Sequence, residues 1–386
     1  MSGINTNVAS LNAQRNLMAS QSSLQTSIQR LSSGLRVNSA KDDAAGLSIA
    51  DRMNTQVRGL TVAARNASDG ISLSQTAEGA LGKVGDMLQR MRELAVQSSN
   101  ATNTQSDRNS LDSEVTQLKA EINRVATQTS FNGVKLLDGS FSGANFQVGA
   151  NAGETISVAS ITNAQTAQLG GTVNIATTSA AASGISGFAT AIVAGDVLIN
   201  GVDIAPAGIS AAGSALERAG QMVNAINLVS GQTNVGASYD AATGQITLRS
   251  STGAIATTGA LNDATVAGFD NTTGTAAAAA TTGITGLNVQ SYSNSQLALT
   301  QIDAALSQVN TARGNLGAIQ GRFENAIDSI NVTSENVTTA RGRIVDADFA
   351  KESANLARAQ VLQQAGTAMV AQANALPNGV MQLLRG

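Results

Sequence analysis

The chain has 386 residues, a formal net charge of −3 at pH 7, and no Cys, His or Trp. These absences exclude disulfides, thiol nucleophiles, imidazole metal sites and His-based acid–base catalysis. No stretch is apolar for long enough to span a membrane, and no basic patch interleaved with aromatic residues indicates nucleic-acid binding. No nucleotide-binding glycine motif is present either. We therefore predict a protein that is not an enzyme, with no catalytic, cofactor or metal site.

A helix is predicted at the N-terminal end of the chain. Leu24, Ile28, Leu31 and Leu35 follow one another at spacings of 4, 3 and 4, which places them on one helical stripe. Gly34 interrupts this pattern, and the pattern returns only after Asp42 and Asp43. A single helix does not need such a break. We therefore expect a joint at residues 34–43, with the two aspartates capping the helix that follows.

Two more helices are predicted between residues 44 and 129. The first extends to about Ala95 and contains several glycines, each of which weakens a helix by about 1 kcal/mol relative to Ala. The polar segment 98–108 separates it from the second, with Ser106 and Asp107 as candidate N-caps. Beyond the second helix, Asn-Gly and Asp-Gly pairs between short apolar runs predict β-hairpins.

The segment from about 160 to 290 has a different character. Gly, Ala, Ser and Thr predominate there, and helical periodicity is weak. We expect a hairpin about Asn200-Gly201, one amphipathic helix over 214–230, and a strand ending at residue 250. Residues 272–286 are of low complexity and are interpreted as a loop. Residues 151–290 hold seven acids and two bases, against 19 acids and 21 bases elsewhere, which favours a solvated middle and ends that pack together.

Helical spacing returns in the last hundred residues. Asp346 and Asp348 open the final helix and, like the earlier Asp pair, are interpreted as helix caps, because a calcium site needs about six oxygens. The segments 1–40 and 345–386 are too small and too rich in Ala, Ser and Gln to form a stable isolated pair. Their stripes are therefore predicted to form an assembly seam, which consists of Leu24, Ile28, Leu31, Leu35, Ala354, Ala357, Val361, Ala368 and Ala371.

Long stretches at both ends resemble a known family. They include "NTNVASLNAQRNL", "QRLSSGLRVNSAKDDAAGLSIADRM" and "ELAVQSSNATNTQSDRNSLDSEVTQLKAEINRVATQTSFNGVKLL" near the N-terminus. The C-terminal stretch is "ENVTTARGRIVDADFAKESANLARAQVLQQAGTAMVAQANALPNGVMQLLRG". These stretches, covering roughly 1–150 and 290–386, are similar to bacterial flagellins. Part of the middle resembles a small repeat module of flagellins and hook-associated proteins.

The resemblance implies a fold that is mainly α at both ends with a β-rich middle, arranged in discontinuous domains. Residues 1–43 and 345–386 would form an axial coiled coil. Residues 44–165 and 290–344 would form an inner helical domain with β-hairpins. Residues 166–289 would form a small α+β outer domain, which is the variable part of the family.

The resemblance also implies a function and a set of partners. The chain would be a structural subunit that is secreted through the flagellar type III apparatus and polymerises into the extracellular filament used for swimming. Besides other copies of itself, its partners would be a cytoplasmic export chaperone, the filament cap and the hook-associated proteins. The alternatives are a hook–filament junction protein or a secreted surface adhesin, whose outer domain would bind a surface.

A receptor site is implied as well. By resemblance, host Toll-like receptor 5 would recognise the monomer at Arg90, Leu94 and Glu114. From the residues alone, the helix face around 88–96 is typical of an ordinary solvated face. The resemblance favours the receptor interpretation.

Overall fold

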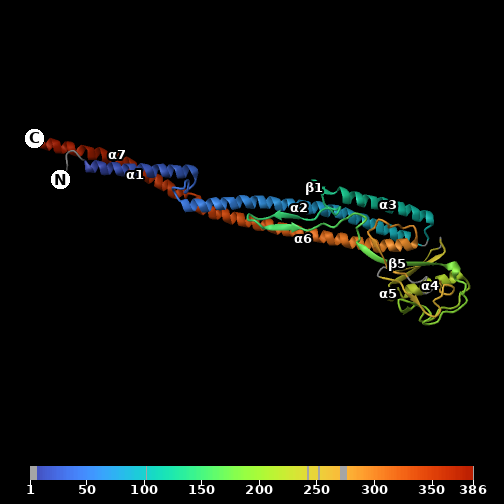
Figure 1. The fold of residues 1–386 in the computed structure, drawn as a ribbon. Helices are drawn as coiled ribbons and strands as arrows, with labels where there is room; N and C mark the ends of the chain where they lie inside the picture. The colour runs from blue at the N-terminus through green and yellow to red at the C-terminus, as the bar shows by residue number, and fades with distance from the viewer. Residues whose placement is uncertain (1–6, 101, 241–242, 251–252, 270–275, 386) are drawn as a thin grey trace. The chain divides into compact units, whose positions relative to one another are not determined.

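The computed structural model describes residues 7–100, 102–240, 243–250, 253–269 and 276–385 (Figure 1). The chain divides into two compact units. Unit 1 comprises Met1–Ser68, Gln147–Thr155 and Asn325–Gly386, and unit 2 comprises Asp69–Phe146 and Ile156–Glu324. Two long helices, α2 (Ala44–Ser98) and α6 (Tyr292–Val345), contribute residues to both units.

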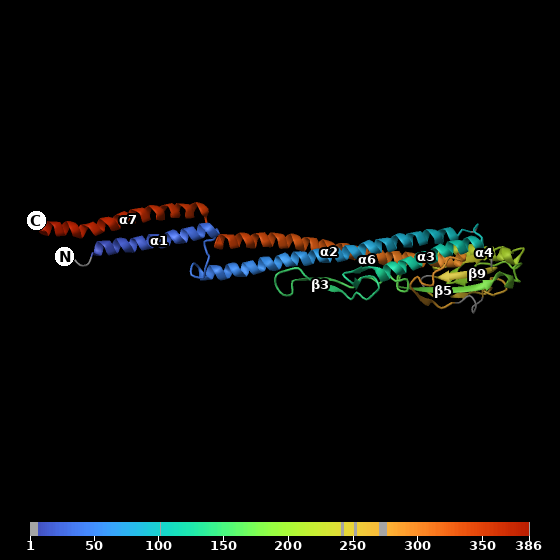
Figure 2. The same ribbon diagram turned by 90° about the horizontal axis from the view of Figure 1, so that it is seen from above.

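Unit 1 is built from helices at the two ends of the sequence. Helix α1 (Val8–Ser33) and helix α7 (Phe349–Arg385) lie side by side (Figures 1 and 2). Helix α1 ends at Gly34, whose φ of 70° is left-handed and suits glycine. The Oδ1 atom of Asp43 accepts a hydrogen bond of 2.7 Å from the backbone N–H of Gly46 and caps α2. Asp348 caps α7 by accepting from the N–H groups of Ala350 and Lys351. The predicted joint is confirmed, and one aspartate of each predicted pair, Asp43 and Asp348, caps its helix, whereas Asp42 binds the turn at Ser39 instead.

The helical part of unit 2 contains α3 (Gln105–Gln128) with parts of α2 and α6. The N-cap of α3 is Thr104, and not Ser106 or Asp107 as the sequence suggested. The Thr104 hydroxyl accepts from the N–H of Asp107, and the Asp107 carboxylate accepts from the N–H of Thr104. Asp107 is therefore the closing residue of a capping box. Side chains from all three helices fill the core, among them Leu81, Leu88, Met91, Val115, Ile122, Val309 and Phe323.

Two predicted hairpins follow α3. Strand β1 (Ser130–Phe131) pairs with β2 (Val134–Lys135) across Asn132-Gly133, which both have positive φ. Strand β3 (Ala144–Gln147) pairs with β4 (Thr155–Val158). Asn-Gly fits the first turn because both central residues of such a turn need left-handed φ.

The remainder of unit 2 is a small α+β assembly. Its main sheet is antiparallel, in the order β11 (Ala279–Thr282), β5 (Thr172–Ala181), β9 (Gln245–Ser250) and β8 (Val235–Asp240). A smaller sheet has the order β10 (Thr257–Thr258), β6 (Leu198–Ile199), β7 (Val202–Asp203). The predicted hairpin about Asn200-Gly201 joins β6 and β7. Helix α4 (Ala215–Leu228) buries Met222 and Ile226 against this core, and two single turns, η1 (Ala182–Gly184) and α5 (Ser230–Thr233), complete it.

One expectation for this region is wrong. The low complexity of residues 272–286 predicts a loop, but residues 279–282 form strand β11 at the edge of the main sheet. Their register with β5 runs from Ala279 opposite Ile175 to Thr282 opposite Thr172. The pairing comes from backbone hydrogen bonds to a distant strand, which low side-chain complexity neither favours nor prevents. Residues 272–275 lie outside the described residues.

Candidate assembly interface

Helix α1 faces α7 with a regular stripe of small and aliphatic side chains. A set of buried and half-buried serine, alanine and leucine positions recurs at spacings of 3 and 4. They are Ser10, Ala13, Leu17, Ser20, Leu24, Ser27 and Leu31. This is the spacing of two helices that pack along their length.

The facing stripe on α7 mixes small, aliphatic and polar residues. Its most covered positions include Glu352, Leu356, Ala359, Gln363, Gly366, Val370 and Ala373. A Cβ atom on Gly366 would lie 3.1 Å from Cδ1 of Leu17. The two backbones therefore approach closely at this point, and glycine leaves room for the leucine.

Polar contacts fix both ends of the α1–α7 pair. Near the chain termini, Nδ2 of Asn7 donates to the carbonyl of Ala373 over 2.7 Å, and the Ser10 hydroxyl donates to Oδ1 of Asn374 over 2.7 Å. At the other end, the Ser27 hydroxyl donates to Oε1 of Glu352 over 2.6 Å. Buried polar groups of this kind penalise any register in which they are unpaired.

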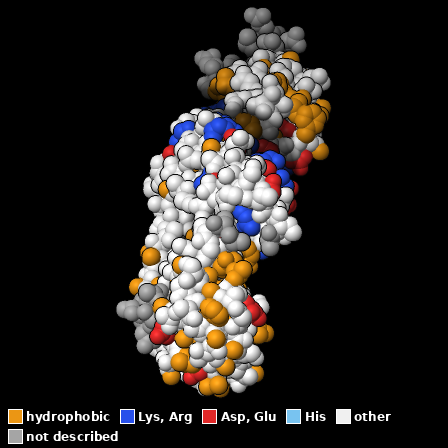
Figure 3. Space-filling view, turned by 90° about the vertical axis from the view of Figure 1, so that its right-hand side faces the viewer, with side chains coloured by type: hydrophobic (Ala, Val, Ile, Leu, Met, Phe, Trp, Pro, Cys, Tyr) orange, Lys and Arg blue, Asp and Glu red, His pale blue; other side chains and the backbone are white. Residues whose placement is uncertain are grey.

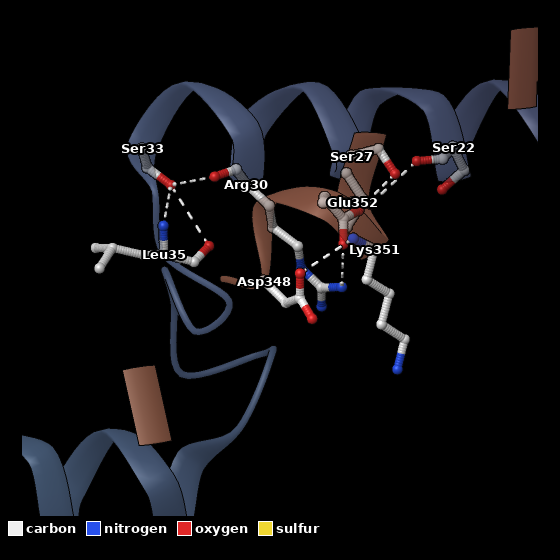
Figure 4. A network of polar contacts seen from close by, with 9 residues as sticks. Ser22, Ser27, Arg30, Ser33, Leu35, Asp348, Lys351 and Glu352 are labelled. Atoms are coloured by element: carbon white, nitrogen blue, oxygen red, sulfur yellow. Dashed lines mark hydrogen bonds and ion pairs between the residues drawn. The ribbon is translucent and has the colours of Figure 1, made fainter. Parts of the chain in front are cut away.

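Glu352 is the central group of the second cluster (Figure 4). It is only 7% exposed, and besides the Ser27 contact its Oε2 atom lies 3.9 Å from Nη1 of Arg30. Figure 4 shows Ser27 and Glu352 pointing toward one another across the two helices. The carboxylate thus has both a hydroxyl donor and a cation nearby, as a buried charge requires.

The predicted seam residues are placed unequally. Leu24, Leu31 and Leu35 are half-buried, whereas Ile28 is 51% exposed. On α7 the five predicted residues are all exposed, and Val361 reaches 64%; they are Ala354, Ala357, Val361, Ala368 and Ala371. These five residues are therefore not the face that packs on α1. Alanine and aliphatic residues occur on every side of α7, so their spacing alone does not show which side of the helix faces α1.

Apolar side chains remain on the outside of both helices. Val8, Met18 and Ile28 are each more than half exposed on α1, as are Phe349, Val361 and Met369 on α7. Exposed aliphatic groups at this density are typical of a surface that another molecule covers. That the predicted seam residues form contacts between subunits remains a prediction.

Backbone hydrogen bonds tie the joint after α1 to the joint before α7. The N–H of Ala347 donates to the carbonyl of Gly34 over 2.9 Å, and the N–H of Arg36 donates to the carbonyl of Val345 over 2.6 Å. Asp42 closes the turn by accepting from the hydroxyl of Ser39, and this hydrogen bond lowers the pKa of the Asp42 carboxyl. The break after α1 and the break before α7 therefore form one hydrogen-bonded joint.

The predicted receptor residues do not form one exposed patch. Nε of Arg90 donates to Oε1 of Glu114 over 2.9 Å, and both side chains are nearly half exposed. This hydrogen bond is the main reason that the pKa of Arg90 is raised above its ordinary value. Leu94 is completely buried in the core of unit 2. The family resemblance groups Leu94 with Arg90 and Glu114, but the core of unit 2 covers Leu94.

The described residues contain neither a metal-binding cluster nor a membrane-spanning helix. No group of three or more acidic side chains is placed to hold a metal ion there. None of the helices that the structure describes is both long and apolar enough to cross a bilayer.

Comparison with known proteins matches this arrangement of terminal helices. Residues 4–142 match the bacterial flagellin N-terminal helical region, and residues 299–384 match the bacterial flagellin C-terminal helical region. Flagellin D of Vibrio cholerae is 38% identical, and flagellin A of Vibrio anguillarum is 41% identical, each over 99% of both chains. The chain belongs to the flagellin family. It is a structural subunit of the flagellar filament and not an enzyme.

Flagellin-family likeness extends into the middle of the chain. Residues 197–252, which include β6, β7, α4, β8 and β9, match the flagellin hook IN motif. A solved flagellin of Bacillus cereus is 19% identical, with a TM-score of 0.35, and the match covers 69% of this chain and 88% of that one. The full-length relatives named above are flagellins, so a junction protein or an adhesin is not favoured.

Proposed function

We propose that the α1–α7 pair is the part of this flagellin through which subunits join into the filament core. The observation that supports this is the double character of α7. One stripe packs closely on α1, and the rest of the helix presents exposed apolar residues, with Val361 64% and Met369 63% exposed. Residues 1–43 and 345–386 would then act as the axial layer, 44–165 with 290–344 as the inner layer, and 166–289 as the outward domain.

Seeded assembly tests this proposal. The purified chain should form helical filaments visible by negative-stain microscopy. Glu352→Ala should weaken them, because it leaves Ser27 and Arg30 without their buried partner, at a cost of about 1–3 kcal/mol per subunit. Calorimetry should show this as a lower filament melting temperature. Glu335→Ala, an exposed change on α6, is the matched control. Equal melting of the two variants contradicts the proposed role of the pair.

Secretion and further partners are part of the same proposal. Subunits would leave the cell through the flagellar type III apparatus, with an export chaperone holding the C-terminal segment beforehand. They would add beneath the filament cap, onto hook-associated proteins. The absence of Cys supports this, because no disulfide has to form before or after passage.

We also propose that Toll-like receptor 5 recognises the monomer, with Arg90 and Glu114 as contact residues and Leu94 in a supporting role. Arg90→Ala should weaken receptor signalling by about tenfold, since charged anchors commonly dominate an interface. Arg92→Ala is the matched control, because Arg92 is similarly exposed on the same helix and pairs with Asp303. A cell reporter assay with monomeric protein measures both variants.

The buried position of Leu94 requires its own control. Leu94→Ala removes a core side chain and should lower stability by about 2–5 kcal/mol, whatever the receptor does. Its signalling defect should therefore disappear at a temperature where the variant is fully folded, whereas that of Arg90→Ala should persist. Equal signalling by the Arg90→Ala and Arg92→Ala variants contradicts the contact.

A further inference from the structure

Strand β9 places an arginine on the face of the main sheet that is turned away from the hydrophobic core. Ile246 and Leu248 of β9 are buried in that core, and Arg249 alternates with them. In register, Arg249 lies between Thr177 of β5 and Gly236 of β8. A Cβ atom on Gly236 would meet nothing closer than Asn227 Oδ1 at 3.9 Å. The glycine therefore leaves open space beside the guanidinium group.

This space is a pocket of about 210 Å³ between the sheet and the first turns of α6. Strands β8 and β9 form one side, and α6 contributes the other. Its polar lining includes Asn234, Ser238, Arg249, Tyr292, Gln296 and Thr300. No Asp or Glu is among the described residues that line it. The pocket therefore carries one positive charge and no negative one.

The Arg249 guanidinium has no counter-charge in the described part of the chain. Its Nε and Nη1 atoms are buried and have no hydrogen-bond partner, and burial lowers the pKa of Arg249 to about 10. A buried charge without a partner destabilises the fold that contains it. The Nε and Nη1 atoms of Arg218, the other arginine of residues 151–290, are also unpaired, but its Nη2 donates to the carbonyls of Phe188 and Thr190 and holds their loop.

Two neutral polar side chains line the same pocket. They are the phenol of Tyr292, which is half-buried, and the amide of Asn234, which is exposed at the edge of the space beside Arg249. Thr300 donates its hydroxyl to the carbonyl of Gln296 and keeps its acceptor capacity. A cation, a phenol and an amide thus converge on one small volume.

We propose that this pocket binds a small carboxylate that also carries hydroxyl groups, which is the chemistry of a sugar acid. The carboxylate takes the place of the missing counter-charge of Arg249, and the hydroxyl groups bond to Tyr292 and Asn234. Charge-assisted bonds from a guanidinium to a carboxylate are among the strong hydrogen bonds in proteins. The volume is below the roughly 300–1,000 Å³ typical of drug-sized ligands, so the ligand is about the size of one monosaccharide.

The surrounding surface supports a single discrete site. Residues 151–290 contain seven acids and two bases, so the domain as a whole repels anions. Figure 3 shows scattered charged side chains, with no continuous basic patch on the face in view. Binding of an anion here therefore depends on Arg249 itself and not on a general positive field.

Calorimetric titration of the monomeric full chain with D-glucuronate tests the proposal, with D-glucose and acetate as comparison probes. Glucuronate should bind, acetate should bind at least tenfold more weakly, and glucose should show no binding. Arg249→Gln should weaken glucuronate binding by about ten- to hundredfold, because it removes the charge-assisted bonds. Tyr292→Phe should weaken it several-fold. Arg124→Gln, at an exposed arginine on α3, should leave it unchanged.

Thermal unfolding shows whether each variant is folded. Arg249→Gln should not lower the melting temperature, because the arginine it replaces is unpaired. Equal binding of acetate and glucuronate, or equal binding by the Arg249→Gln and Arg124→Gln chains, would overturn the proposal. So would a loss of seeded assembly in Arg249→Gln with glucuronate binding unchanged, since the carboxylate would then come from a second copy. Failure of the wild-type chain to polymerise bears on the proposed function and not on this pocket.

Discussion

Deleting residues 345–386 should abolish filament formation while leaving unit 2 folded. The deletion removes α7, and α1 then loses the stripe that covers Leu17, Leu24 and Ser27. A 26-residue helix rich in Ser and Gln does not stay helical alone in water. The helical signal in circular dichroism should therefore fall by the 37 residues of α7 and also by those of α1.

The same deletion separates folding from assembly. All of the deleted residues belong to unit 1, and unit 2 contains none of them. Its cooperative unfolding in urea should therefore persist with little change. Filaments formed by the shortened chain would contradict the proposed role of the α1–α7 pair. Loss of the unit 2 transition would show instead that the helices stabilise the whole chain.

Gly70→Ala should be among the most destabilising single changes in α2. A Cβ atom at this position would lie 2.5 Å from Cζ of Phe323, a distance that real contacts do not reach. Phe323 is fully buried and packs edge-to-face on Phe146, with ring centroids 5.4 Å apart. The ring therefore cannot move aside without disturbing a second aromatic contact. Overpacking of this kind costs about 1–3 kcal/mol.

Gly79→Ala is the matched control on the same helix. Nothing lies within 4 Å of a Cβ atom built on Gly79. Alanine there should stabilise the chain by about 0.5–1 kcal/mol, since it is the better helix former and restricts the unfolded chain. Urea unfolding of both variants measures the two effects. Destabilisation of similar size in both variants would mean that the loss of stability comes from replacing a glycine in the helix and not from a clash with the Phe323 ring.

Local signals in the sequence predicted the element boundaries well. Gly34 ends α1 and Asp43 begins α2 because each effect depends on atoms within four residues. Asn200-Gly201 likewise makes its hairpin from two residues alone. Thr104, Ser106 and Asp107 are all residue types that cap helices, so the local sequence does not distinguish them, and only the structure shows Asp107 closing the capping box from inside α3.

Features that depend on distant segments could not be predicted in the same way. The side of α7 that faces α1 is fixed by the close approach of Gly366 to Leu17, a contact between opposite ends of the sequence. The burial of Leu94 follows from packing within unit 2, and helical spacing from Arg90 cannot show it. The unpaired state of Arg249 needed both β8 and α6 in place. In each case tertiary packing, and not local propensity, decides the outcome.

The hydrogen bonds between α1 and α7 join residues that are 325 to 366 positions apart. Helix α1 is made first and meets its partner only after almost the whole chain exists. A chain that stops before Ala373 lacks the groups that accept hydrogen bonds from Asn7 and Ser10. Its terminal helices therefore cannot form the polar contacts at this end of the α1–α7 pair. Pairing of the termini therefore requires a chain that extends at least to Asn374, so this contact distinguishes a finished chain from a shorter fragment.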